Sequence, residues 1–117
     1  MKRKRKPIVK MRTFSSSMKS VIEKESKILL VDDQGYNRTA LKIILKHHAK
    51  VDVENICDEA GNGKEALHAV LKNLASNNFE KCSYKLILMD CNMPIMDGYQ
   101  ATKKIRSFLK TLNLDQP

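Results

Sequence analysis

Short apolar runs alternate with stretches of helical spacing along most of this chain. Lys85 to Met89 has no polar interruption after its first residue, and Lys27 to Val31 has the same character. Such runs are typical of strands buried on both faces, in a parallel sheet that helices cover. A weaker apolar segment from Val53 to Ala60 is flanked by charged residues, which predicts a strand at the edge of the sheet.

Three other segments repeat their apolar residues with the spacing of a helix. The first runs from Tyr36 to His48, the second opens at Asn62, and the third starts near Asp97 or Gly98. Asn62 and Glu65 have the spacing of a capping box. The residues expected to face the sheet are Ala40, Leu41, Ile44 and Leu45 in the first helix, Leu67, Val70, Leu71 and Leu74 in the second, and Ala101, Ile105, Phe108 and Leu112 in the third. Strands that alternate with helices predict parallel βαβ units and an α/β fold.

The N-terminal residues 1–26 have a different composition from the rest. They contain the cluster KRKRK, Pro7 and the serine run 15–17, with few large apolar residues. Such a segment buries too little surface to offset its chain entropy, which predicts a flexible arm or linker, with a short helix at 20–25. We therefore divide the chain into a basic arm, residues 1–26, and one domain, residues 27–117.

The net charge of +9 belongs to the arm. Residues 1–27 hold ten Lys or Arg and two Glu, a charge of +8, whereas residues 28–117 hold twelve Lys or Arg and eleven Asp or Glu, a charge of +1. A basic cluster can serve as a nuclear import signal or contact nucleic acid or acidic lipid, but a solvated linker is the favoured interpretation. The domain has no recognition motif, so we expect no specific nucleic-acid binding.

No apolar stretch is long enough to cross a bilayer, and the N-terminus lacks the apolar core of a signal peptide. Cys57, Cys82 and Cys91 have no metal-ligand spacing, and an odd number cannot all pair within the chain. These features predict reduced thiols and a cytoplasmic location, with the nucleus as the alternative that the basic cluster suggests.

Carboxylates follow both apolar runs. Asp32 and Asp33 come directly after Val31, and Asp90 comes directly after Met89. An isolated Asp more often only caps a strand, but adjacent parallel strands would bring all three carboxylates to one crevice at their C-terminal ends. Their mutual repulsion favours a hard divalent cation such as Mg²⁺, which prefers oxygen ligands.

Three segments together resemble a known family. KILLVDD at 27–33, GNGKEAL at 61–67 and LILMDCNMPIMDGYQATKKIR at 86–106 are similar to the receiver domain of two-component response regulators, in the form fused to hybrid histidine kinases. The resemblance covers residues 27–108, and the DxNMPxMDG segment is its most specific part. It implies a flavodoxin-like, doubly wound parallel sheet with strand order 2-1-3-4-5.

The resemblance also implies a chemistry. Asp90 would be the phosphoacceptor, taking a phosphoryl group from a phosphohistidine on a histidine kinase or histidine phosphotransfer protein. Mg²⁺ would be held by Asp33, Asp90 and the backbone carbonyl of Asn92, while Asp32 would act through water. Such a domain is a signalling module and not itself an enzyme, although its parent protein can be a histidine kinase.

The chain departs from the family pattern at its C-terminal side. Receivers end the fourth strand with Ser or Thr and the fifth with Lys, and the sequence stops at Pro117, before either. We therefore expect a fragment of a longer protein with an incomplete sheet, strands 2-1-3 and three helices, and self-association through the exposed edge of the third strand. The alternative function is a non-phosphorylated pseudo-receiver that acts as a docking module. A magnesium-dependent phosphohydrolase is less consistent with the sequence, which supplies no separate general acid.

Overall fold

A three-stranded parallel sheet in the order β2-β1-β3 organises the computed structural model, which describes residues 26–117. The predicted flexible arm and the short helix at 20–25 lie outside the described residues. The elements, in chain order, are β1 (Lys27–Val31), α3 (Gly35–His48), α4 (Val53–Ile56), β2 (Cys57–Ala60), α5 (Gly63–Ser76), β3 (Tyr84–Met89) and α6 (Gly98–Thr111). The predicted α/β fold and the strand order 2-1-3 are confirmed.

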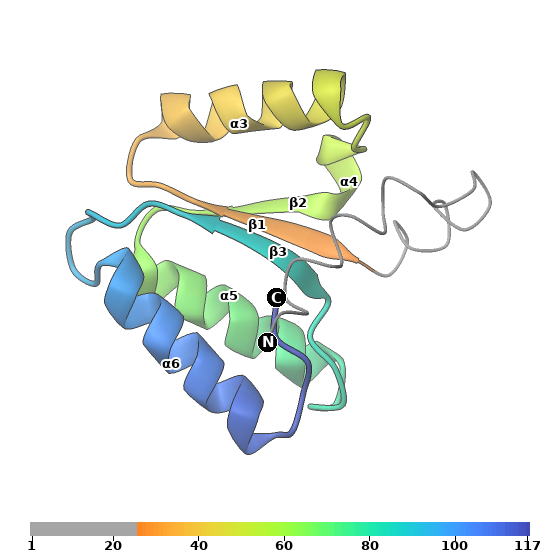
Figure 1. Cartoon of the computed structure of the whole chain (residues 1–117), viewed down its shortest axis with the longest axis vertical. Coiled ribbons are helices and arrows are strands. Elements are labelled where there is room, and N and C mark those ends of the chain that lie inside the picture. The colour runs from red at the N-terminus through yellow and green to blue at the C-terminus, as the bar shows by residue number, and fades with distance from the viewer. Residues whose placement is uncertain (1–25) are drawn as a thin grey trace.

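Helices cover both faces of the sheet. α3 lies on one face, and α5 and α6 lie together on the other (Figure 1). Because side chains alternate along a strand, β1 contributes to two cores. Ile28 and Leu30 pack in the core on the α3 side, whereas Leu29 and Val31 pack in the core on the side of α5 and α6. The prediction that β1 is buried on both faces is confirmed.

β3 is covered on both faces, as predicted, but its side chains are less buried than those of β1. Within the described residues β3 pairs only with β1, and Leu86 to Met89 are half-buried. Ile87 and Met89 pack against the core on the side of α5 and α6, and Leu86 and Leu88 pack against the core on the α3 side. The apolar run therefore belongs to a strand with an open edge.

The predicted strand from Val53 to Ala60 is half strand and half helix. Residues 53–56 form the single turn α4, and only Cys57–Ala60 pairs with β1, as the edge strand β2. The backbone N–H groups of Asn55 and Ile56 donate to the carbonyl of Asp52, at 3.1 and 3.0 Å. Val53 and Ile56 are three residues apart, so one helical turn buries both on the α3 side of the sheet.

Three predicted core positions are wrong, and the first of them, Ala40, is exposed. Ile44 is 51% exposed and Phe108 is 44% exposed. In α6 the buried positions are Gly98, Ala101, Ile105 and Leu109, so the helix presents Leu109 to the sheet and turns Phe108 outward. α3 contacts the sheet only through a narrow stripe that includes Leu41 and Leu45, and it has no fully buried residue.

Side chains cap α5 and α6 at the positions where the sequence predicts that these helices start. Asn62 Oδ1 accepts the N–H of Glu65 at 2.9 Å, and Glu65 Oε1 accepts the N–H of Gly61 at 2.7 Å. Asp97 Oδ1 accepts the N–H of Gln100 at 2.8 Å at the start of α6. Each cap satisfies a donor that the first helical turn leaves free and fixes where the preceding loop ends.

One carboxylate joins the three strands at the end of the sheet opposite the acidic cluster. Asp58 Oδ2 in β2 accepts Lys27 Nζ at 3.0 Å and the Tyr84 hydroxyl at 2.6 Å, from the first residues of β1 and β3. Burial, and then the hydrogen bond to Asp58, raise the pKa of Tyr84 well above its usual value.

Among residues 26–117 no helix has the length and hydropathy needed to span a membrane.

Candidate functional site

The acidic residues lie where β1 and β3 end side by side. Val31 and Met89, the last residues of the two strands, are paired in register. The N–H of Asp90 donates to the carbonyl of Val31 at 2.9 Å, and the N–H of Asp32 donates to the carbonyl of Ala60 at 3.2 Å. The sheet hydrogen bonds therefore continue one residue past each strand and bring both aspartates to its C-terminal edge.

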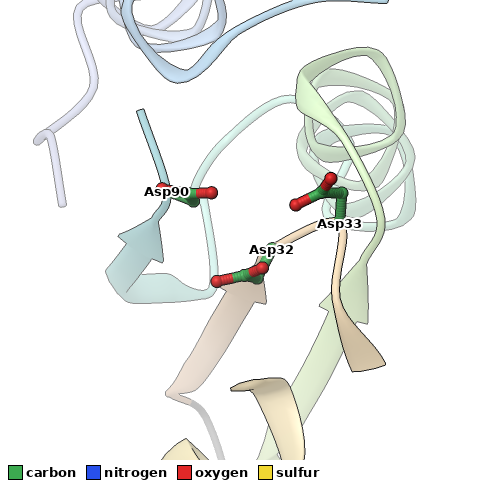
Figure 2. A group of neighbouring side chains, drawn as sticks. All are labelled: Asp32, Asp33 and Asp90. Carbon is green, nitrogen blue, oxygen red and sulfur yellow. The ribbon is translucent and has the colours of Figure 1, made fainter. Parts of the chain in front are cut away.

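The carboxylates of Asp32, Asp33 and Asp90 converge (Figure 2). One ligand atom from each lies within 4.8 Å of the others; Asp32 and Asp90 are half-buried, and Asp33 is exposed. Oxygens bound to one octahedral Mg²⁺ lie up to about 4.2 Å apart, so small side-chain movements would let all three groups face one ion. The donor set, three hard carboxylates, fits this cation. The contribution of the Asn92 carbonyl stays a prediction.

Two close backbone contacts fix the loop that follows Asp90. A Cβ on Gly98 would collide with the carbonyl of Asp90, and the N–H of Gly98 donates to the carbonyl of Cys91 at 2.9 Å. A Cβ on Gly63 would collide with the carbonyl of Met96, which accepts the N–H of Gly63 at 2.9 Å. The starts of α6 and α5 therefore hold the two ends of loop 91–97, and any larger residue at either glycine would displace it.

Ile95, in the same loop, has a strained backbone. Its φ is 72°, in the left-handed region that β-branched residues rarely adopt. Its side chain is 76% exposed, so packing of that side chain does not explain the conformation. Instead, the hydrogen bond from Gly98 to Cys91 fixes the chain before Ile95, and the one from Gly63 to Met96 fixes it after. Such strain collects at functional loops.

Two residues of the site were not found from the sequence. Asn37 and Arg38, in the first turn of α3, hydrogen-bond to Asp32 through its side chain and its backbone respectively. The sequence carried a weak signal for them, because a polar residue one turn into a helix lies near the loop that leads into it. That spacing alone does not distinguish a site contact from a solvated helix face.

Cys91, next to Asp90, is exposed and lies by Tyr99. A hydrogen bond with Cys91 raises the pKa of Tyr99. Cys57 is half-buried, and burial raises the pKa of its thiol to about 11, while Cys82 is buried and its pKa is raised by the same cause. All three are free thiols, as predicted.

Residues 28–114 match the family model of the response regulator receiver domain. The chain belongs to the response regulator receiver family. The resemblance that the DxNMPxMDG segment carries is thus confirmed, and the match includes all three carboxylates.

Several curated relatives of this receiver are histidine kinases. Hybrid signal transduction histidine kinase B of Dictyostelium discoideum is 41% identical over 95 residues, 81% of this chain and 4% of the relative. Histidine kinase CKI1 of Arabidopsis thaliana is 37% identical over 78% of this chain and 8% of its own length. Two-component response regulator ORR41 of Oryza sativa subsp. japonica is 40% identical over 68% of this chain and 55% of its own length. The chain therefore spans a small part of most of these relatives.

Solved receiver structures share the fold. The receiver domain of CKI1 from Arabidopsis thaliana complexed with Mg²⁺ has a TM-score of 0.69 and 33% identity, over 79% of this chain and 63% of that one. The same domain complexed with Mg²⁺ and BeF₃⁻ has a TM-score of 0.68 and 34% identity, over 84% of this chain and 67% of that one. The magnesium and beryllium fluoride complexes are properties of that domain.

Proposed function

We propose that this receiver accepts a phosphoryl group on Asp90 from a phosphohistidine, in a two-component phosphorelay. One observation carries the proposal: Asp90 directly follows the apolar strand β3 and converges with Asp32 and Asp33. Family membership supports the same reaction. Phosphoryl transfer requires alignment and neutralisation of charge more than covalent chemistry from the protein. A carboxylate cluster that holds a cation beside the nucleophile would meet both requirements.

In the proposed reaction a carboxylate oxygen of Asp90 attacks phosphorus in line with the histidine nitrogen. A P–O bond to Asp90 forms and the P–N bond breaks, so the electron pair stays on the imidazole, which then takes up a proton. The product is an acyl phosphate. The hydrogen bond from the N–H of Asp90 to Val31, and the contact of Gly98 with the Asp90 backbone, hold the nucleophile in place.

Asp33 and Asp90, with the carbonyl of Asn92, would hold Mg²⁺ directly, and Asp32 would act through water. When bound, the ion neutralises charge on the phosphoryl oxygens and on the cluster. Asp33 is exposed and Asp32 and Asp90 are only half-buried, so the phosphoryl donor has access from solvent.

The proposal extends to the partner, the parent protein and the location in the cell. The partner is a histidine kinase or a histidine phosphotransfer protein, and the parent protein is a hybrid histidine kinase, as the named relatives suggest. Residues 1–26 form a linker and 27–117 the receiver unit; the start of β1 at Lys27 supports this division. The unit acts inside the cell, in the cytoplasm or, through the basic cluster, the nucleus.

We also propose that β3 self-associates when no other segment covers it. Its edge leaves backbone N–H and C=O groups unpaired within the described residues. Beside it lies an open depression of about 570 Å³, lined by residues that include Met89, Cys91, Tyr99 and Thr102. Unpaired strand groups next to an apolar depression are suited to pairing with a second chain.

Chemical trapping tests the phosphoacceptor. The full chain is incubated with acetyl phosphate and Mg²⁺, reduced with borohydride and mapped by mass spectrometry. We expect label on Asp90 alone, none in Asp90→Asn, and unchanged labelling in Asp115→Asn, a control at an exposed carboxylate far along the chain from the site. Label on Asp32 or Asp33 but not on Asp90 would overturn the assignment. A folded chain without label would favour the docking-module alternative.

A further inference from the structure

Asp32 differs from the other two carboxylates in its contacts. Among residues 26–117 it alone of the three accepts side-chain or backbone hydrogen bonds through its carboxylate. The N–H of Gln34 donates to Oδ1 at 2.9 Å, and the Asn37 amide donates to Oδ1 and Oδ2 at 3.3 and 3.2 Å. A carboxylate has about four acceptor positions, so Asp32 has few left for a ligand.

The backbone of Asp32 is held as well. Arg38 Nη1 donates to its carbonyl, and the Nε of the same guanidinium donates to Glu59 Oε1 in β2 at 2.8 Å. Lys42 Nζ pairs with the other oxygen of Glu59 at 2.7 Å. Two consecutive residues of α3, Asn37 and Arg38, thus hydrogen-bond to Asp32. Arg38 also links Asp32 to β2 through Glu59.

We infer that Asn37 and Arg38 are positioning residues that fix the orientation of Asp32 towards the cation, an inference that rests on the proposed function. Asn37 donates to the carboxylate and sets its rotation, and Arg38 sets the position of its backbone. Oδ1 already accepts two hydrogen bonds, so only Oδ2 keeps an acceptor position, enough to orient one water ligand. Asp33 and Asp90 keep their oxygens for the ion. The partners that orient a metal ligand commonly change metal affinity by about 10- to 100-fold.

Paired substitutions separate this role from a structural one. Asn37→Leu keeps the size of the exposed side chain and removes the donor, and Thr39→Val, two residues further along the helix, is the matched control. Arg38→Met and Lys42→Met each remove one cation from Glu59, but only the first also frees the carbonyl of Asp32. The measurement is Mg²⁺ affinity by calorimetry on the full chain, with circular dichroism to verify folding.

We expect Mg²⁺ binding to weaken about tenfold in Asn37→Leu and in Arg38→Met, and to stay within about twofold of wild type in Thr39→Val and Lys42→Met. The inference is wrong, and the proposed function stands, if Asn37→Leu binds Mg²⁺ as tightly as wild type does. The same holds if Lys42→Met loses as much Mg²⁺ affinity as Arg38→Met. If the folded wild-type chain binds no Mg²⁺, the proposed function fails and the inference fails with it.

A readout without metal covers a variant that does not fold. In the wild-type chain the side-chain amide of Asn37 is expected to exchange its protons with solvent more slowly than that of Asn113, which is also exposed. Asp32→Ala should remove that difference, as followed by NMR. Equal exchange of the two amides in the wild-type chain would overturn the inference.

Discussion

At the scale of single residues, the carboxylates and their supports were not equally visible in the sequence. Asp32, Asp33 and Asp90 were predicted to converge because each follows an apolar run, and parallel strands place such residues at one edge. Asn37 and Arg38 could not be identified in that way. Their contacts depend on the angle at which α3 leaves the loop after Asp33, and that angle follows from packing and not from spacing.

The strained Ile95 gives a residue-scale prediction. Ile95→Gly should stabilise the fold by about 0.5–1 kcal/mol, because glycine adopts the left-handed region without the penalty of about 1–2 kcal/mol and loses part of the gain as chain entropy. The exposed side chain contributes little burial. Urea denaturation measures the change. Ile43→Gly, at an exposed position within α3, is the control and should destabilise by about 1 kcal/mol. Destabilisation by both would mean that Ile95 contributes packing.

At the scale of elements, long periodic patterns predict the structure, whereas patterns of only a few residues do not. β1, the cap of α5, the start of α6 and the stripe of α5 follow the sequence closely. The single turn α4 was missed because four residues are too few to show a helical period, and Val53 and Ile56 suit either structure. Phe108 was misplaced because its neighbour Leu109 is equally apolar and only the crossing of α6 over the sheet decides between them.

The contact between α3 and β2 through Glu59 gives a prediction about pH. Hydrogen bonds from Lys42 and then Arg38 lower the pKa of Glu59 below its usual value of 4.5. A lowered pKa in the folded state means that Glu59 stabilises the fold above the unfolded pKa, and that this stability is lost as the pH falls through the folded pKa. Glu59→Gln should therefore lower the free energy of unfolding by up to about 1 kcal/mol at neutral pH and by almost nothing in acid. The effect is small because ion pairs that are partly exposed to solvent are weak.

Urea titrations of wild type and Glu59→Gln, at neutral pH and below the folded pKa of Glu59, test this dependence. The difference in the free energy of unfolding between the two proteins should disappear on acidification. A gap that persists in acid would show that the carboxamide disturbs packing and that the charge is not responsible.

At the scale of the whole molecule, the proposed ion couples the acidic cluster to overall stability. Mg²⁺ that binds only the folded chain adds about 1–2 kcal/mol at a tenfold excess over its dissociation constant. Thermal melting should therefore shift upward with millimolar Mg²⁺. Asp33→Asn should remove most of the shift, and Asp115→Asn should keep it. An equal shift in Asp33→Asn would place the ion outside the cluster.

The open edge of β3 predicts the behaviour of the full chain in solution. Sedimentation should show a concentration-dependent dimer or larger species, because the edge and its depression remain uncovered in a monomer. Replacing the half-buried Leu88 by Lys, to put a charge on β3, should shift the equilibrium to monomer, and Ile43→Lys on α3 is the matched control. A monodisperse monomer at all concentrations would rule out self-association through this edge.

The bond between Tyr84 and Asp58 gives the protein an optical reporter. The chain has no tryptophan and three tyrosines, of which Tyr36 and Tyr99 are exposed and Tyr84 is buried. Since burial holds the Tyr84 phenol protonated in the folded state, its tyrosinate absorbance should appear in alkali only once the sheet opens. Ultraviolet absorption at high pH thus follows the separation of the three strands without any attached label.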